Sequence, residues 1–165
     1  MNTMRLACFA VYISIFTLVL LIIGCNKQPD VDENFKSIIR RYDQQLTALF
    51  MTYDLEPIKE NITESHFNRL DHRLTGLKNA NRRMESTVKQ IEFLEYKDDG
   101  IKKTGFPHAQ VKTRETWDIR HIDARTGQVV KEVRGLVYDL LYEFEQQNGV
   151  WKIDAANVLK EKKQN

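Results

Sequence analysis

The chain has 165 residues, and its 25 lysines and arginines against 23 acidic residues give a formal net charge of +2. Acidic and basic residues are interspersed along the sequence. This pattern argues against a nucleic-acid-binding protein, in which lysine and arginine cluster on one surface. The composition is that of a globular domain, with 42% hydrophobic residues.

The first 24 residues have the layout of a secretory leader, with Arg5 as the only charge before the apolar run of residues 6–23. The segment Ile22-Ile23-Gly24-Cys25 resembles the cleavage box of bacterial lipoprotein signals, although Ile23 is larger than the residue usual there. The resemblance implies that Cys25 is lipidated and becomes the new N-terminus, and several acyl chains anchor a protein stably. The alternative is an uncleaved transmembrane helix, because about 18 apolar residues just span a bilayer.

Both alternatives place the domain outside the cytoplasm, anchored to the cell membrane or the outer membrane, because Arg5 keeps the N-terminus inside. After residues 1–24 the predicted organisation is a short tether (25–31), one domain (32–160) and a basic tail (161–165). Cleavage removes Cys8, so the domain has no disulfide, no thiol nucleophile and no cysteine metal cluster.

Helical periodicity opens the domain. Residues 32–53 carry one apolar stripe with a spacing of three and four residues, which predicts a helix, and Asp30 with Glu33 is a candidate capping pair. Pro57 interrupts the pattern, so residues 56–62 form at most a short helical turn.

A third helix is predicted to begin at Thr63 or Ser65, either of which is a suitable cap. From Ser86 the period changes to two, which indicates strands at residues 88–96 and 109–122. In the second strand one alternating set of side chains is predicted to face the core, and the other set to face solvent. The core-facing set is Ala109, Val111, Thr113, Glu115, Trp117 and Ile119.

Residues 128–147 form a predicted third strand that is too long to be straight, since ~3.3 Å per residue gives a length of about 60 Å. The apolar alternation slips by one residue at Gly135, which predicts a bulge and a curved sheet. A curved sheet covered by helices leaves a cavity between the two layers.

Asn148-Gly149 is a two-residue hairpin turn that fixes the register of a last strand ending near Val158. The same register places Glu143 opposite Asp154, an unfavourable like-charge pair. The other predicted facing pairs are Phe144 with Ile153, Gln146 with Trp151, and Glu145 with Lys152.

This order of three helices and four antiparallel strands, with a long bent third strand, resembles the nuclear-transport-factor-2-like or cystatin-like cone fold over residues 36–158. The likeness is carried by Ala109-Gln-Val111, by Glu115-Thr-Trp117, and by the closing hairpin Asn148-Gly149-Val-Trp151-Lys152-Ile153. This hairpin is also similar to one in the intermembrane-space domain of plastid-division proteins. The resemblance implies an α+β fold of three helices packed on a curved four-stranded antiparallel sheet, and the leader adds an N-terminal signal or anchor helix before it. It implies no single activity, because the superfamily includes isomerases, dehydratases, polyketide cyclases and non-catalytic binding modules.

The candidate pocket residues are Glu115 and Trp117 on the second strand, with Tyr138 and Tyr142 on the third. A carboxyl group removed from water has a raised pKa and can act as a base. The alternative is that Glu115 lies at the wet rim of the sheet or pairs with Arg134 or another arginine. The tryptophans Trp117 and Trp151 are interpreted as packing residues, and the four histidines, which lack metal-ligand spacing, as surface or structural residues.

These observations predict an envelope lipoprotein that uses no metal or cofactor. Its domain would be a non-catalytic module that binds another envelope protein or a small apolar ligand. The alternative is an isomerase- or hydrolase-like enzyme that uses Glu115, and a third interpretation is a scaffold or maturation factor for an envelope assembly. A homodimer through the outer face of the sheet is compatible with the fold that the chain resembles. No nucleic-acid partner is expected.

Overall fold

The computed structural model of the protein describes residues 31–102 and 104–163. The predicted leader, Cys25 and nearly all of the tether lie outside the described residues. Among the residues that are described, no helix is long and apolar enough to cross a bilayer. The elements in chain order are α2 (Glu33–Thr52), the 3-10 helix η1 (Glu56–Asn61), α3 (Glu64–Asn79), β1 (Arg82–Ile101), β2 (Pro107–Asp123), β3 (Val129–Gln147) and β4 (Val150–Lys163).

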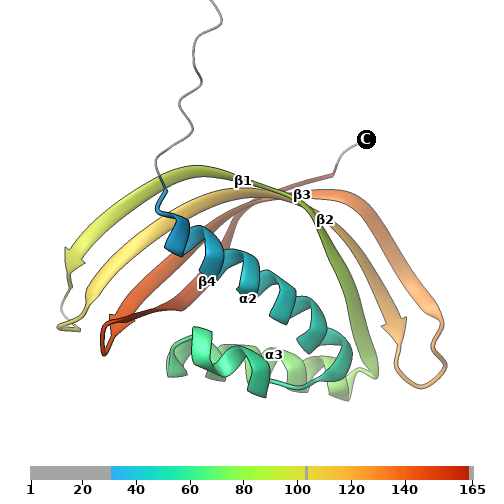
Figure 1. Cartoon of the computed structure of the whole chain (residues 1–165). Coiled ribbons are helices and arrows are strands. Elements are labelled where there is room, and N and C mark those ends of the chain that lie inside the picture. The colour runs from blue at the N-terminus through green and yellow to red at the C-terminus, as the bar shows by residue number, and fades with distance from the viewer. Residues whose placement is uncertain (1–30, 103, 164–165) are drawn as a thin grey trace, which may run out of the picture.

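The four strands form one open antiparallel sheet in the order β1-β2-β3-β4, so β1 and β4 are its edges. The sheet arches over α2 and α3, which lie against its concave side (Figure 1). The predicted α+β class and antiparallel sheet are therefore confirmed. The prediction of three helices is corrected, because the middle one is the 3-10 helix η1, which has a proline in its first turn.

The helix boundaries follow from local caps. Asp32 caps α2 by accepting a hydrogen bond from the backbone N–H of Asn34 at 2.8 Å, so the predicted capping pair of Asp30 and Glu33 is wrong. Thr63, one of the two predicted caps, begins α3 by accepting a hydrogen bond from the backbone N–H of His66.

The predicted bulge at Gly135 is confirmed. Trp117 pairs with Leu136 while Ile119 pairs with Val133, so the single β2 residue between them faces two residues of β3. Gly135 has a φ of 61°, which favours glycine, and its N–H donates to Asp118 Oδ1 at 2.9 Å. A bulge of this kind bends its strand and increases the local twist.

The hairpin from β3 to β4 has the predicted register, with the three facing pairs that involve Phe144, Glu145 and Gln146. Glu143 faces Ala155 instead of Asp154, because the ladder shifts between Glu143 and Phe144. The predicted like-charge pair is therefore absent.

Three strands are longer than predicted. β2 runs from Pro107 to Asp123 rather than over residues 109–122. β1 begins at Arg82 and ends at Ile101, beyond both ends of the predicted 88–96. β4 reaches Lys163 rather than ending near Val158, so the first residues of the predicted basic tail belong to the sheet.

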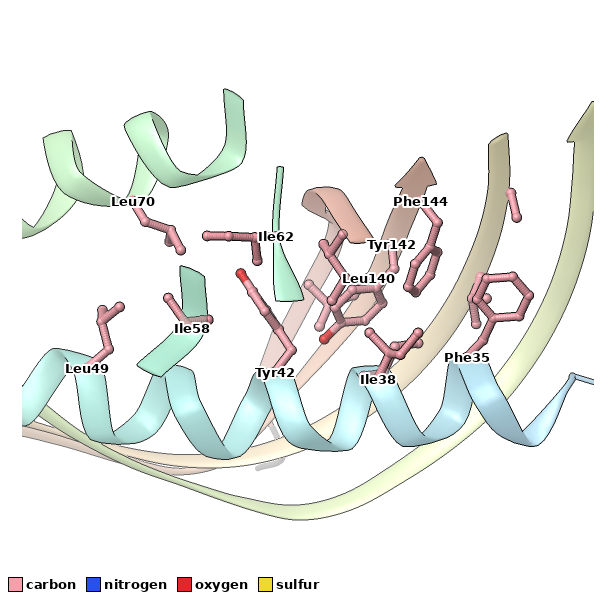
Figure 2. Close-up of a cluster of buried hydrophobic side chains, with 14 of the residues drawn as sticks. Phe35, Ile38, Tyr42, Leu49, Ile58, Ile62, Leu70, Leu140, Tyr142 and Phe144 are labelled. Atoms are coloured by element: carbon pink, nitrogen blue, oxygen red, sulfur yellow. The ribbon is translucent and has the colours of Figure 1, made fainter. Parts of the chain in front are cut away.

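The core lies between one face of α2 and the concave face of the sheet. Phe35, Ile38, Tyr42 and Leu49 project from α2 toward η1, α3 and the strands (Figure 2). The rings of Phe35 and Phe144 meet edge to face with centroids 4.8 Å apart. All six predicted core-facing residues of β2 are buried.

Candidate functional site

A cavity of about 310 Å³, called the inner cavity below, lies between α2, α3 and the concave face of the sheet. Exposed Arg73 and Val158 are among its lining residues, so it opens to solvent on that side. Its walls are mainly apolar and aromatic with a small number of polar groups, which is the usual character of small-molecule sites. The polar or ionisable side chains around it are those of Tyr42, Asp43, His66, Arg73, Ser86, His121, Tyr138 and Tyr142.

A second hollow of about 520 Å³, called the outer groove, runs between α2 and β1. Its residues on α2 are Arg40, Asp43, Gln44 and Thr47, and those on β1 are Ser86–Ile91. Asp43 and Ser86 line both the inner cavity and the outer groove. Asp43 is therefore part of the wall between the two hollows.

Glu115 is completely buried beneath the inner cavity, with a 0% exposed fraction. Thr113 Oγ1 donates to its Oε1 at 2.8 Å, and Trp117 Nε1 donates to its Oε2 at 2.9 Å. Arg134 pairs with Glu132 instead. The alternative of a wet-rim Glu115, or of one paired with Arg134, is therefore wrong.

Tyr142 connects Glu115 to a second buried carboxyl group, that of Asp43 on α2. The Tyr142 hydroxyl lies 2.9 Å from Glu115 Oε1 and 3.0 Å from Asp43 Oδ1. Burial raises the pKa of Asp43 well above its usual value, and the charge of Glu115 raises it further. Burial also raises the pKa of Glu115, against the lowering effect of hydrogen bonds from Thr113, Tyr142 and Trp117.

His66 on α3 makes a second buried polar contact, with its Nε2 2.8 Å from the hydroxyl of Tyr42. Burial lowers the pKa of His66 to about 4 and raises that of Tyr42. Both groups are therefore neutral near neutral pH. No hydrogen-bond partner for His66 Nδ1 or Asp43 Oδ2 is found among the described residues.

The four candidate pocket residues come together as follows. Trp117, Tyr138 and Tyr142 line the inner cavity. Glu115 is not among its lining residues, but it is hydrogen-bonded to Trp117 and Tyr142, which are. Glu115 thus holds two wall residues in place.

Sequence reasoning missed Asp43 and His66, although both carry a readable signal. Asp43 lies four residues after Ile39 and seven before Phe50, so it is on the apolar stripe of its helix. His66 lies four residues before Leu70, on the apolar face of α3. An ionisable residue within an apolar stripe is a candidate for a buried functional group.

The remaining histidines and Trp151 take no part in the hydrogen bonds found for Asp43 and Glu115 among the described residues. His108 is buried with its Nε2 2.8 Å from Thr104 Oγ1, His121 lines the inner cavity, and His72 is exposed. Trp151 packs against Phe35. Across residues 31–102 and 104–163, no group of three or more histidine, cysteine, aspartate and glutamate side chains is arranged to hold a metal ion.

The fold and the cavity together define an open-sheet α+β domain with an interior pocket beside a buried carboxyl pair. No protein-family model matches the sequence, and no curated protein matches it. Among solved structures, the chain is similar to the crystal structure of the intermembrane space region of the chloroplast protein ARC6. The TM-score is 0.61 with 15% sequence identity, and the match covers 79% of this chain and 98% of that one. At this identity the likeness shows a common fold, in agreement with the resemblance described for the closing hairpin.

We predict that Glu115→Gln lowers the free energy of unfolding by about 1–3 kcal/mol, because the new amide group would face the Trp117 or Thr113 donor with an N–H of its own. Trp117→Phe removes the indole donor, so the double variant should lose less than the sum of the two single changes. Urea denaturation of the four proteins measures this coupling. Glu92 on β1 is exposed, so Glu92→Gln is the matched control and should change the free energy of unfolding little. Additive single losses would contradict the hydrogen-bond geometry.

We also predict that His66 makes the fold less stable as the pH falls from 6.5 to about 4. In this pH window His66 binds a proton in the unfolded chain but stays neutral in the folded chain, so protonation favours unfolding. The carboxyl pair has raised pKa values and acts in the opposite sense, favouring the fold as the pH falls. The difference in unfolding free energy between the natural chain and His66→Gln isolates the histidine. A difference independent of pH would contradict the prediction.

Proposed function

We propose that this chain is a membrane-anchored envelope lipoprotein whose domain is a non-catalytic module that binds a small, largely apolar ligand in the inner cavity. The observation that carries the proposal is the inner cavity itself. It combines an apolar and aromatic wall with a few polar residues, and two of these, Asp43 and His66, have a buried side-chain atom without a hydrogen-bond partner among the described residues. A binding site needs such atoms to orient a ligand.

The envelope location is supported by the sequence before the domain. Leu6–Ile23 is an apolar run that ends two residues before Cys25, and the domain begins soon after that cysteine. The similar solved domain is itself an intermembrane space region, which is compatible with an envelope location for this chain. Lipidation of Cys25 would hold the domain close to the bilayer, within reach of apolar molecules.

Filling the inner cavity should abolish binding. Ala156 is half-buried on β4 and lines this cavity, so Ala156→Phe places a ring inside it. We expect the variant to lose binding of naphthalene, a small apolar fluorescent probe, by at least about tenfold, and to release any small molecule that co-purifies with the natural chain. The matched control is Val150→Phe, at an exposed position of the same strand, which should bind normally. Unchanged binding by Ala156→Phe would exclude the inner cavity as the site.

The anchor has an independent test. Cys25→Ser should move the protein from the membrane fraction to the soluble fraction of the envelope, or leave an unprocessed precursor, because the acylated thiol is lost. Globomycin, which inhibits the lipoprotein signal peptidase, should make a precursor of the natural chain accumulate. Cys8→Ser is the control and should behave like the natural chain. No change in mobility with globomycin would remove the lipoprotein proposal.

A second candidate function is an isomerase- or hydrolase-like enzyme that uses an acidic residue, favoured by the two carboxyl groups joined through Tyr142. Groups with raised pKa values beside a cavity can transfer protons at neutral pH. Of the two, Asp43 lines the inner cavity, whereas Glu115 does not, so Asp43 would exchange the proton. The test is incubation of small ketones with the protein in deuterium oxide. Exchange of hydrogens next to the carbonyl that disappears in Asp43→Asn would support an enzyme, and no exchange would exclude this reaction class.

A further inference from the structure

The hydrogen bonds of Tyr142 require a proton on one of its two carboxyl neighbours. A tyrosine hydroxyl has one hydrogen, yet a carboxyl oxygen lies within 3.0 Å of it on either side. It can donate to one of them only. The second contact is a hydrogen bond only if that carboxyl is protonated and donates to the tyrosine oxygen. The pair therefore holds one proton, which also avoids two negative charges in a buried place.

The other partners show which carboxyl carries this proton. Glu115 receives hydrogen bonds from Thr113 and Trp117 in addition to that from Tyr142, and donors of this kind stabilise the ionised form. Tyr142 is the single side-chain partner of Asp43 among the described residues. The arrangement that satisfies every group is a proton on Asp43 Oδ1 donated to Tyr142, and the hydrogen of Tyr142 donated to ionised Glu115.

This arrangement leaves Asp43 Oδ2 as a carbonyl-type acceptor. Asp43 is only 2% exposed, it lines the inner cavity as well as the outer groove, and its buried Oδ2 has no partner among the described residues. A buried acceptor without a partner is costly, so the site gains from a ligand that supplies a donor.

We propose that the inner cavity takes an uncharged, mainly apolar ligand whose hydroxyl or amide N–H donates to Asp43 Oδ2. This inference rests on the proposed function, because it names the ligand class of the same cavity. The cavity volume of about 310 Å³ corresponds to about ten water molecules, so a single ring with a short chain fits. A cationic ligand is disfavoured, because Asp43 is neutral and the ligand would have to pass exposed Arg73 at the opening of the cavity. An anionic ligand is disfavoured because it would lie close to ionised Glu115.

Four small probes of similar shape separate the alternatives: 4-propylphenol, its methyl ether 4-propylanisole, 2-phenylethylammonium and 3-phenylpropanoate. Each is titrated into the full-length chain in detergent solution, and binding is followed by the NMR signal of the Trp117 indole N–H, which lies at the cavity wall. We expect 4-propylphenol to bind about tenfold more tightly than 4-propylanisole, as one additional hydrogen bond allows. The two charged probes should bind no better than the ether.

Substitutions at Asp43 test the protonation state. Asp43→Asn should keep the preference for the phenol, because the amide oxygen replaces Oδ2 and the amide N–H donates to Tyr142. Asp43→Leu should remove the preference, with the phenol and the ether binding equally. Thermal unfolding of both variants checks that they fold. Tightest binding by the ammonium probe, lost in Asp43→Asn, would show an ionised Asp43 and overturn the inference.

An infrared measurement provides a test that needs no ligand. The natural chain at neutral pH should show the carbonyl stretch of a protonated carboxylic acid, and this band should disappear in Asp43→Asn but remain in Ala156→Phe. Absence of the band in the natural chain would overturn the inference. If naphthalene binds but the phenol and the ether are equal, or none of the four probes binds, this inference fails and the proposed function stands. If naphthalene does not bind either, the proposed function fails as well.

Discussion

The hydroxyl of Tyr142 is shared by two buried carboxyl groups, one on α2 and one on β2, and this contact fixes the helix on the sheet. Asp43 and Tyr142 are 99 residues apart in the sequence. Removing two carboxyl groups from water is expensive unless each finds donors. Thr113 and Trp117 supply donors on the β2 side, so the network orders the wall of the inner cavity as well as the position of α2.

The curvature of the sheet makes room for this network. The sheet has a concave face, with a bulge at Gly135 of β3, and α2 and α3 lie against this face (Figure 1). The inner cavity remains between these helices and the sheet. The apolar side chains form a large cluster under α2 and a small one of Trp117, Ile119 and Leu136. Met84 and Tyr138 pack against both clusters and line the inner cavity, which therefore lies where the two clusters meet. The two packed apolar clusters on either side of the inner cavity therefore hold its polar side chains in position.

Much of the sheet could be predicted because its determinants are local. Alternation of period two assigned the buried face of β2, and Asn148-Gly149 set the register of the last hairpin. The like-charge pair of Glu143 and Asp154 was predicted because a regular ladder was assumed, whereas a shift beside Phe144 separates these residues. The cap at Asp32 was missed because several acidic residues in succession can each begin the helix.

The site could be predicted only in part. Glu115 could be predicted because it is a charged residue that interrupts the buried face of a strand. Asp43 and His66 interrupt the apolar faces of their helices in the same way, but the sequence analysis did not select them. The sequence by itself determined which side chains of each strand face inward and where the chain turns, because strand period and turn geometry depend on neighbouring residues. Only the tertiary structure decided that Asp43, Glu115 and Tyr142 meet at one hydroxyl group. The folding of a curved sheet around a helix brings distant residues together, and no local pattern encodes that distance.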